Sequence, residues 1–118
     1  MEKFYLEKPT IKRKNDAIEY INQNYTNKLT LKEISEKVCI SPSYLSRIFK
    51  LETGESLNQF INIVRVENAK RLLDNTDYRI WEVCEKSGFP NSKYFSQVFK
   101  KIVGMAPKEY KEKAEKVG

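Results

Sequence analysis

The chain has no histidine and few of the residues that build most enzyme and metal sites. Without histidine it lacks the commonest acid–base group and the commonest metal ligand at neutral pH. Its two cysteines stand alone, without a CxxC spacing, and the sequence contains no glycine-rich phosphate loop. The acidic residues are scattered and form no obvious carboxylate pair. We therefore expect no enzymatic activity, no metal site and no cofactor.

Long hydrophobic runs are also absent. No stretch approaches the roughly 20 apolar residues that a membrane span needs, and the first fifteen residues contain no apolar core followed by a small-residue cleavage site. Unpaired cysteines are typical of a reducing compartment. These features predict a cytoplasmic protein with no membrane partner. With 118 residues, the chain is long enough for one domain or two very small ones.

What the chain does have is positive charge. Lysine and arginine number 22 against 16 acidic residues, which gives a formal net charge of +6. An excess of this kind favours polyanionic partners, with nucleic acid first and an anionic membrane second. The total charge does not identify the partner. The distribution of the charged residues along the chain has to distinguish between these partners.

A repeat organises the chain. Residues 43–50 read SYLSRIFK, and residues 93–100 return as KYFSQVFK. Between them, residues 56–75 contain no glycine or proline and place apolar side chains three and four residues apart, which is typical of a helix with a buried face. We interpret this stretch as a helix joining two copies of one small unit.

The first copy carries the signals of a helix-turn-helix. After a helical pattern that starts at residue 16, Thr30 and Glu33 form a predicted capping box at the start of a short helix. Ser41, followed by proline, predicts the N-cap of a second helix over 42–53, and Gly54 its left-handed C-cap. Two short helices joined by so tight a turn are typical of this motif.

The second copy follows the same pattern with small differences. A short helix begins at Ile80, with Arg79 in the position of the Thr30 cap, so its cap is weaker or supplied differently. The turn carries one extra residue, and the next helix, over 91–103, ends at Gly104. The predicted core side of that helix is Phe95, Val98, Phe99 and Ile102.

The second helix of each copy exposes a polar and basic face. Spacings of three, four and seven residues place side chains on one side of a helix. In the first copy these are Ser43, Ser46, Arg47 and Lys50, and in the second Lys93, Ser96, Gln97 and Lys100. One such face is common on any surface helix. Two faces matched through an internal repeat favour a shared binding function.

These faces have the chemistry to read DNA. A helix fits the major groove, where arginine bonds the O6 and N7 of guanine and glutamine the N6 and N7 of adenine. The predicted base-facing residues are Ser43, Ser46, Arg47, Lys50, Asn91, Ser92, Lys93, Ser96 and Gln97. The predicted phosphate contacts are Lys100 and Lys101, and the helix N-terminus at Asn91 and Ser92 also favours a phosphate.

Other side chains have competing interpretations. Tyr44 and Tyr94 occupy equivalent places beside the two faces, where packing is favoured over a phosphate contact. Cys84 is interpreted as a small core residue. Arg65 lies among apolar neighbours, and we expect it to form an ion pair whose partner the sequence leaves open. The candidate partners are Glu67, Glu82 and Glu85.

These residues resemble the DNA-binding domain of the AraC/XylS family of bacterial transcription regulators. The resemblance covers about residues 14–113 and is most specific over 80–111, in Gly88-Phe89, Tyr94-Phe95-Ser96, Phe99-Lys100-Lys101, Gly104, Pro107 and Tyr110. The first copy matches in residues 41–47, Phe49-Lys50 and Gly54. The sequence departs from the usual pattern at Cys84, where alanine is common, and at Gln97, where arginine is frequent.

The resemblance implies an all-α domain of seven helices, in which two homeodomain-like helix-turn-helix subdomains are joined by a long central helix. It implies sequence-specific binding of double-stranded DNA and transcription regulation, with helices 42–53 and 91–103 reading adjacent major-groove segments. RNA polymerase is a further expected partner. We expect the domain to be monomeric and to hold no small-molecule site.

The composition of residues 78–89 is closest to the output domain of a YesN-like two-component response regulator. An excised output domain is favoured over a small stand-alone regulator, since residues 1–14 are interpreted as a tail or linker remnant. The remaining predicted boundaries are 15–55 for the first helix-turn-helix unit, 56–75 for the connecting helix, 76–114 for the second unit and 115–118 for a C-terminal tail. The alternative function is a basic helical adaptor that binds an acidic protein.

The connecting helix suggests a spacing rule. About 19 helical residues span about 28 Å, and successive major grooves on one side of B-DNA lie about 34 Å apart. One chain could therefore present both recognition helices to neighbouring grooves. The difference in length predicts that full engagement bends the DNA or that one unit binds less tightly.

Overall fold

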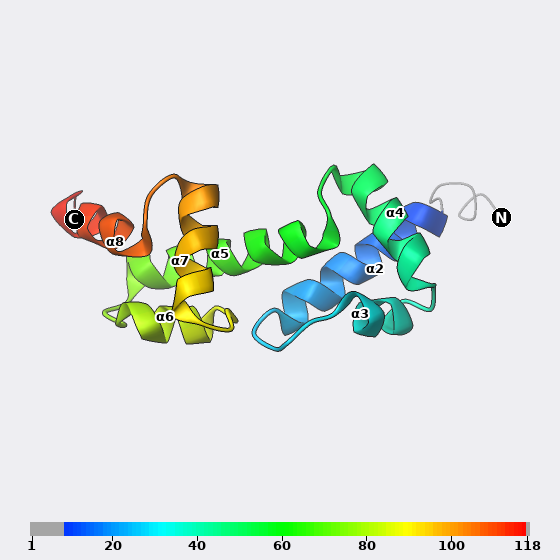
Figure 1. Cartoon of the computed structure of the whole chain (residues 1–118), viewed down its shortest axis with the longest axis horizontal. Helices are drawn as coiled ribbons and strands as arrows, with labels where there is room; N and C mark the ends of the chain where they lie inside the picture. Colours follow the sequence, from blue (N-terminus) through cyan, green and yellow to red (C-terminus); the bar gives the residue numbers. More distant parts are fainter. Residues whose placement is uncertain (1–8, 118) are drawn as a thin grey trace. The chain divides into compact units, whose positions relative to one another are not determined.

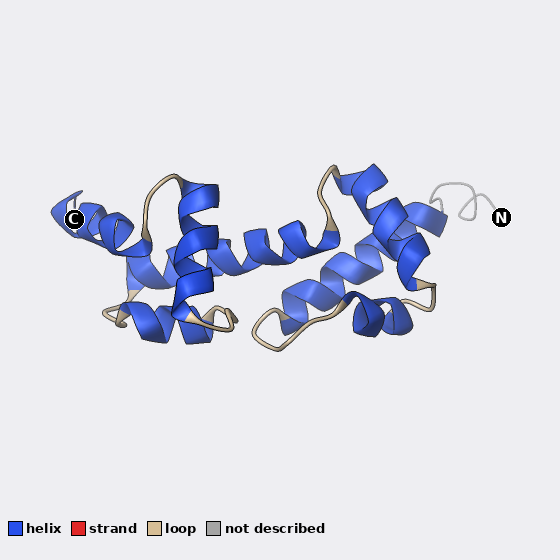
Figure 2. Cartoon of the chain, in the orientation of Figure 1, coloured by secondary structure: helices blue, strands red, loops and turns tan. Residues whose placement is uncertain are grey.

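The computed structural model describes the backbone of residues 9–117 and the side chains of residues 10–115. This part of the chain is helical, with loops between the helices and no strand (Figures 1 and 2). The helices are α2 (Pro9–Asn24), α3 (Leu31–Lys37), α4 (Pro42–Thr53), α5 (Leu57–Asn75), α6 (Ile80–Lys86), α7 (Ser92–Val103) and α8 (Pro107–Val117). Over these described residues, the predicted all-α class with seven helices is confirmed.

The chain divides into two compact units. The first contains the residues up to Asn24 and Leu29–Ile61, and the second contains Tyr25–Lys28 and the residues from Asn62 onward. Helix α5 contributes to both, since its first turn belongs to the first unit and the rest to the second. The loop between α2 and α3 belongs with the second unit.

The core of the first unit lies between α2, α3 and α4, which contact one another pairwise (Figure 1). Apolar residues three and four positions apart on each helix meet here, so each amphipathic face is buried. The Phe49 ring is fully buried and packs edge-on against Phe60 of α5, with centroids 5.2 Å apart. The buried apolar residues of this unit are Ala17, Ile21, Ile34, Val38, Leu45, Ile48, Phe49, Leu57 and Ile61.

The core of the second unit is richer in aromatic rings. Phe95 packs between Phe89 and Phe99, with centroid distances of 5.0 and 5.7 Å, and Phe99 is edge-on to Tyr110 of α8 at 5.6 Å. Cys84 is buried in this cluster, as predicted for a small core residue. The cluster consists of Val66, Ala69, Leu73, Val83, Cys84, Phe89, Phe95, Val98 and Phe99.

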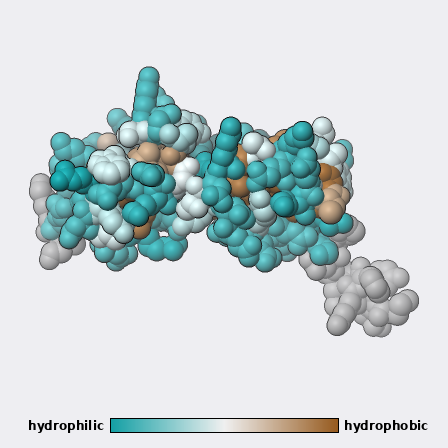
Figure 3. Space-filling view, turned by 90° about the horizontal axis from the view of Figure 1, so that it is seen from below, coloured by the Kyte–Doolittle hydropathy of each residue, from teal (hydrophilic) through white to brown (hydrophobic). Residues whose placement is uncertain are grey.

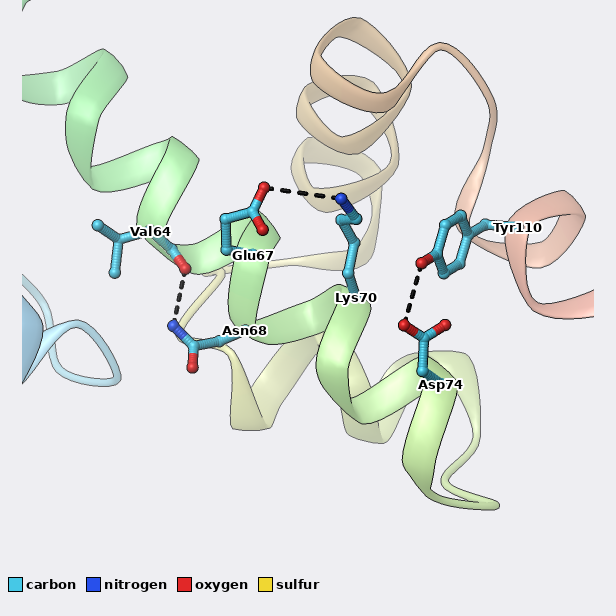
Figure 4. A network of polar contacts seen from close by, with 6 residues as sticks. All are labelled: Val64, Glu67, Asn68, Lys70, Asp74 and Tyr110. Carbon is cyan, nitrogen blue, oxygen red and sulfur yellow. Dashed lines mark hydrogen bonds and ion pairs between the residues drawn. The ribbon is translucent and has the colours of Figure 1, made fainter. Parts of the chain in front are cut away.

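Polar contacts hold α8 on the second unit. The Tyr110 hydroxyl donates to the Asp74 carboxylate of α5 at 3.2 Å, and the Lys111 ammonium donates to the Tyr78 carbonyl at 2.8 Å. Figure 4 shows Tyr110 directed at Asp74, one turn beyond the surface ion pair of Lys70 and Glu67. Helix α8 is therefore fixed by the ring contact of Tyr110 with Phe99 and by these two hydrogen bonds.

Each helix-turn-helix turn contains one residue in the left-handed region. In the first turn it is Cys39, with φ 62°, and in the second it is Gly88, with φ 91°. A Cβ on Gly88 would lie 2.1 Å from the Tyr25 carbonyl oxygen, so this position requires glycine for space as well as for conformation. The second turn has the extra residue that the repeat predicted: residues 87–90 precede the Asn91 N-cap, whereas residues 38–40 precede Ser41.

Three local expectations need correction. Helix α2 begins at Pro9, not near residue 16, because proline is well tolerated in the first helical turn. Helix α8 continues to Val117, so residues 115–117 extend it. Ile102, predicted to face the core, is 40% exposed near the end of α7. Residues 1–8, part of the predicted tail, lie outside the described residues.

The predicted capping box of α3 is half formed. The Thr30 hydroxyl accepts from the Glu33 N–H at 3.0 Å, as expected. The Glu33 carboxylate, however, accepts from the Tyr20 hydroxyl at 2.6 Å, so it is engaged by α2. In α6 the other half forms: the Glu82 carboxylate accepts from the Arg79 N–H at 3.0 Å.

Candidate nucleic-acid interface

Helix α4 presents its predicted polar face to solvent. Its apolar side is fixed in the core by Leu45, Ile48 and Phe49, whose exposed fractions are 0%, 3% and 0%. The opposite side therefore has to face outward, and all four predicted residues on it are exposed: Ser43, Ser46, Arg47 and Lys50. No acidic residue occurs in the first turn of this helix.

The ends of α4 are fixed by its caps. The Ser41 hydroxyl accepts from the Tyr44 N–H at 3.2 Å, and Gly54 adopts φ 82° with its N–H donating to the Lys50 carbonyl. Both caps are those the sequence predicts. They set the length of the exposed face, because α4 starts and stops at defined residues.

Helix α7 repeats this arrangement in the second unit. Phe95 and Phe99 are fully buried, and Val98 is 9% exposed. The outward residues are Lys93, Gln97, Lys100 and Lys101, which are exposed, and Ser96, which is half-buried. The face carries three lysines and no acidic residue, and Gly104 ends the helix with φ 95°.

The N-terminus of α7 is open to an anion. Asn91 is the N-cap, and its side-chain oxygen accepts from the Tyr94 N–H at 2.8 Å. The N–H groups of Ser92 and Lys93 lie in the first turn, where a helix offers no internal acceptor. Both residues are exposed. In α4 the corresponding first residue is Pro42, which has no N–H to offer.

The surface is hydrophilic over most of the face shown in Figure 3, where hydrophobic residues form only small patches. Among the described residues, no group of three or more histidine, cysteine, aspartate or glutamate side chains is placed to hold a metal ion. No described helix is long and apolar enough to cross a membrane. The features that stand out are thus the two polar and basic helix faces.

A family model described as a helix-turn-helix domain matches residues 34–113. The chain belongs to this family and is of the AraC type. Similar proteins include the transcriptional regulator YijO of Escherichia coli (strain K12), which is 36% identical over 93 residues. That match covers 79% of this chain and 33% of the relative, so the chain spans about a third of its length.

Solved structures give the same result. The C-terminal domain of the two-component response regulator yesN from Fusobacterium nucleatum superposes with a TM-score of 0.79 and 35% identity, covering 85% of this chain and 98% of that one. The DNA-binding domain of AdpA, solved in complex with a target DNA, has a TM-score of 0.81. It is 22% identical, with 85% of this chain and 90% of that chain covered, and this likeness concerns the fold. The predicted YesN-like resemblance is confirmed.

In this AraC-type domain the two equivalent tyrosines differ in their contacts. Tyr44 is half-buried, and the Arg47 guanidinium lies over its ring, with Cζ 5.4 Å from the centroid. Tyr94 is 39% exposed, and its hydroxyl accepts from the Asn62 side chain at 3.0 Å. Its ring is edge-on to Phe89 at 6.1 Å. Both rings pack as expected. The contact of Tyr94 with Asn62 and the stacking of Arg47 on Tyr44 are not among the predicted contacts.

The predicted ion pair of Arg65 is wrong. Arg65 is 9% exposed and donates to two backbone carbonyls of the loop before α3, from Nε to Tyr25 and from Nη2 to Asn27, each at 2.9 Å. Burial lowers the pKa of its guanidinium from the usual value, with a smaller opposing effect from Tyr94. Arg65 has a structural role in the second unit, as the sequence favoured, with carbonyl oxygens as its partners.

Trp81 is 59% exposed on α6, between the core position Val83 and the half-capping Arg79. Near it, Glu82, Glu85 and Lys86 line a shallow surface hollow. The predicted DNA-binding residues fall into two groups, one on α4 and one at α7, and the core of each unit holds its own group in place.

Proposed function

We propose that this chain binds double-stranded DNA sequence-specifically and regulates transcription, with α4 and α7 as its two reading helices. The observation that carries the proposal is the repeated construction of the two faces. Each is on the second helix of a helix-turn-helix, each is free of acidic side chains, and each is held outward by buried residues on its opposite side. A positively charged helix of this kind suits the major groove.

Base reading is assigned to the outward-facing side chains of each helix and to the Asn91 N-cap of α7. Arg47 suits guanine and Gln97 suits adenine, through paired hydrogen bonds to the major-groove edge. The serine hydroxyls of both faces are short enough to allow close approach of the helix. The full base-facing set stays as predicted: Ser43, Ser46, Arg47, Lys50, Asn91, Ser92, Lys93, Ser96 and Gln97.

Phosphate binding is assigned to the end and the start of α7. Lys100 and Lys101 are exposed in its last turn, and the N–H groups of Ser92 and Lys93 open its first turn. Phosphate contacts fix the register of a protein on DNA, and base contacts supply the sequence preference. We therefore expect the two sets to respond differently to mutation.

Selection of bound duplexes from a random pool tests sequence preference directly. An enriched motif is expected, and its absence would overturn the proposal. Binding through six or more phosphates should weaken by about 10³-fold between 50 and 200 mM salt. The adaptor alternative predicts no motif and tighter binding to an acidic protein than to duplex DNA.

Two variants separate base reading from phosphate binding. Arg47→Ala should cost about 1–3 kcal/mol and relax one base position, whereas Lys101→Ala should weaken all duplexes alike. Gln97→Ala should relax a different base position from that of Arg47→Ala. Equal losses on every duplex for Arg47→Ala would remove this residue from base reading.

The wider context is also a proposal. We infer that the chain acts as the output domain of a longer cytoplasmic regulator, binds its site as a monomer and contacts RNA polymerase. The chain matches only 33% of the length of YijO, which supports the inference that it is one domain of a longer regulator. Sedimentation of the chain with a selected duplex should give one chain per site. A footprint over two neighbouring groove segments would support reading by both helices, and protection of one segment only would contradict it.

A further inference from the structure

The contact between Arg47 and Tyr44 gives the first reading helix a feature that the second lacks. The two residues are three positions apart on α4, so their side chains share one side of the helix. The Arg47 guanidinium carbon lies 5.4 Å from the centroid of the Tyr44 ring. This is within the range of an attractive contact between a cation and the negative face of an aromatic ring.

Tyr44 is suited to act as a support because it is more buried than its partner. Tyr44 is half-buried, whereas Arg47 is exposed. A free arginine side chain has many rotamers and loses that freedom when it binds a base. Stacking on a ring with two side-chain torsions restricts the guanidinium before DNA arrives. Part of the ordering cost of base recognition is then already met in the free protein.

The direction of the contact also fits base reading. Side chains on a helix lean toward its N-terminus, so Arg47 extends from its own position back toward Tyr44. The N-terminal part of a recognition helix is the part that contacts base edges. The stacked guanidinium is therefore held toward the end of α4 from which a base is read.

The second unit shows that this stacking is not a requirement of the fold. There Gln97 takes the place of Arg47. The Asn62 amide donates to the hydroxyl of the equivalent Tyr94 at 3.0 Å, and the Tyr94 ring contacts Phe89. The helix, its caps and its buried face are nevertheless built in the same way. The stacking contact therefore depends on the arginine at position 47 and is not a general feature of the helix-turn-helix.

We propose that Tyr44 is a positioning residue that holds the Arg47 guanidinium for base recognition and so sets the sequence preference of the first unit. Tyr44 need not touch DNA for this role. The inference rests on the proposed function, because it takes Arg47 as a base reader. Loss of the ring should reduce discrimination at one base pair by about 2- to 5-fold.

The test is a set of variants in two backgrounds. Tyr44→Phe keeps the ring, and Tyr44→Leu removes it but keeps an apolar side chain. Each is made with Arg47 present and with Arg47→Ala. Binding is measured to a selected duplex and to the same duplex altered at the base pair that Arg47→Ala relaxes. Tyr94→Leu, in the other unit, is the matched control.

With Arg47 present, Tyr44→Leu should reduce discrimination at that base pair, while Tyr44→Phe and Tyr94→Leu should leave it unchanged. With Arg47→Ala, Tyr44→Leu should have no further effect on discrimination. A uniform loss on both duplexes, or the same loss in both backgrounds, would overturn the proposal and make Tyr44 a packing residue. Thermal melts followed by circular dichroism check that each variant is folded.

A second measurement keeps the proposal testable if Tyr44→Leu does not fold. In the free protein, the Arg47 side-chain N–H resonance should be shifted upfield by the Tyr44 ring, and Tyr44→Phe should preserve the shift. An unshifted resonance would overturn the proposal.

The failure of this proposal and the failure of the proposed function give different results. If no duplex motif is enriched at all, the proposed function fails. If Arg47→Ala relaxes a base pair and Tyr44→Leu does not, only the role of Tyr44 fails.

Discussion

The two helix-turn-helix turns place different residues in the same backbone conformation. In the first unit Cys39 has φ 62°, and in the second Gly88 has φ 91°. The hydrogen bonds around them correspond: Ile40 donates to the Ser35 carbonyl and Phe89 to the Cys84 carbonyl, each at 3.1 Å. The conformation alone therefore does not demand glycine. In the second turn the backbone of Tyr25 and Thr26, in the same unit, lies against Gly88, whereas Cys39 in the first turn is exposed.

The largest expected effect follows from this difference. Gly88→Ala should destabilise the second unit by about 3 kcal/mol or more, because the new Cβ would meet the Tyr25 carbonyl and the residue would hold a strained φ. Cys39→Ala, at the equivalent position, should change stability by less than about 0.5 kcal/mol. Urea denaturation followed by Trp81 fluorescence measures the second unit, which contains the single tryptophan. Equal losses for the two variants would contradict the comparison.

The contacts of Arg65 account for the close approach at Gly88. Its guanidinium binds the Tyr25 and Asn27 carbonyls and lies beside Gly88. Arg65→Met keeps the length of the side chain and removes both hydrogen bonds, so we expect a loss of about 2 kcal/mol in the free energy of unfolding. Arg71→Met, on the exposed side of the same helix, should cost less than about 0.5 kcal/mol.

The salt dependence of stability distinguishes the observed carbonyl partners of Arg65 from the predicted glutamate partners. An exposed ion pair weakens as ionic strength rises, whereas hydrogen bonds to backbone carbonyls are less sensitive. The difference in stability between the wild type and Arg65→Met should therefore stay nearly constant between 50 and 500 mM salt. A difference that shrinks strongly would favour the ion pair that the sequence suggested.

Local signals in the sequence predicted most of this fold. Ser41, Gly54 and Gly104 act as caps through contacts within a few residues, so the sequence alone identifies them. The repeat likewise predicted both outward faces. The partners of Arg65 could not be predicted this way, because they are backbone atoms 38 and 40 residues away. Backbone carbonyls leave no mark in the sequence, whereas glutamates do.

Some of the contacts and boundaries that were not predicted do have a signal in the sequence. Tyr44 and Arg47 are three residues apart on a predicted helix, a spacing at which side chains meet, so the sequence alone is enough to suggest their stacking. Pro9 is suited to open a helix, yet the charged residues after it obscured the start of α2. The exposure of Ile102 had no local signal, since its spacing from Phe95, Val98 and Phe99 is that of a core position.

The two half-formed capping boxes give a smaller test of the comparison. Thr30→Ala should cost about 1 kcal/mol, since the Thr30 hydroxyl caps the Glu33 N–H. Arg79→Thr should complete the box of α6, which has the return bond from Glu82 but no side-chain cap at residue 79, and should stabilise the second unit by up to about 1 kcal/mol. Arg79→Ala is the control and should be nearly neutral. Denaturation curves of the three variants measure these differences, and a loss for Arg79→Thr would show that the second box is complete without a hydroxyl.

The smallest expected effect is a difference at alkaline pH. Tyr110 of the second unit occupies the place of Phe60 in the first, and partial burial, followed by its bond to Asp74, raises the pKa of its hydroxyl above the ordinary value of 10.0. Because the folded-state pKa is raised, the stabilisation is complete below pH 10 and is lost as the pH rises through the folded-state value. The advantage of the wild type over Tyr110→Phe should be under about 1 kcal/mol, because the pair is exposed, and should fall between pH 9 and 12. Stability curves of the two proteins across this pH range test the prediction. An advantage of the wild type that grows with pH would mean that the folded-state pKa of Tyr110 is lowered. A cation, not Asp74, would then be the main neighbour of the phenol.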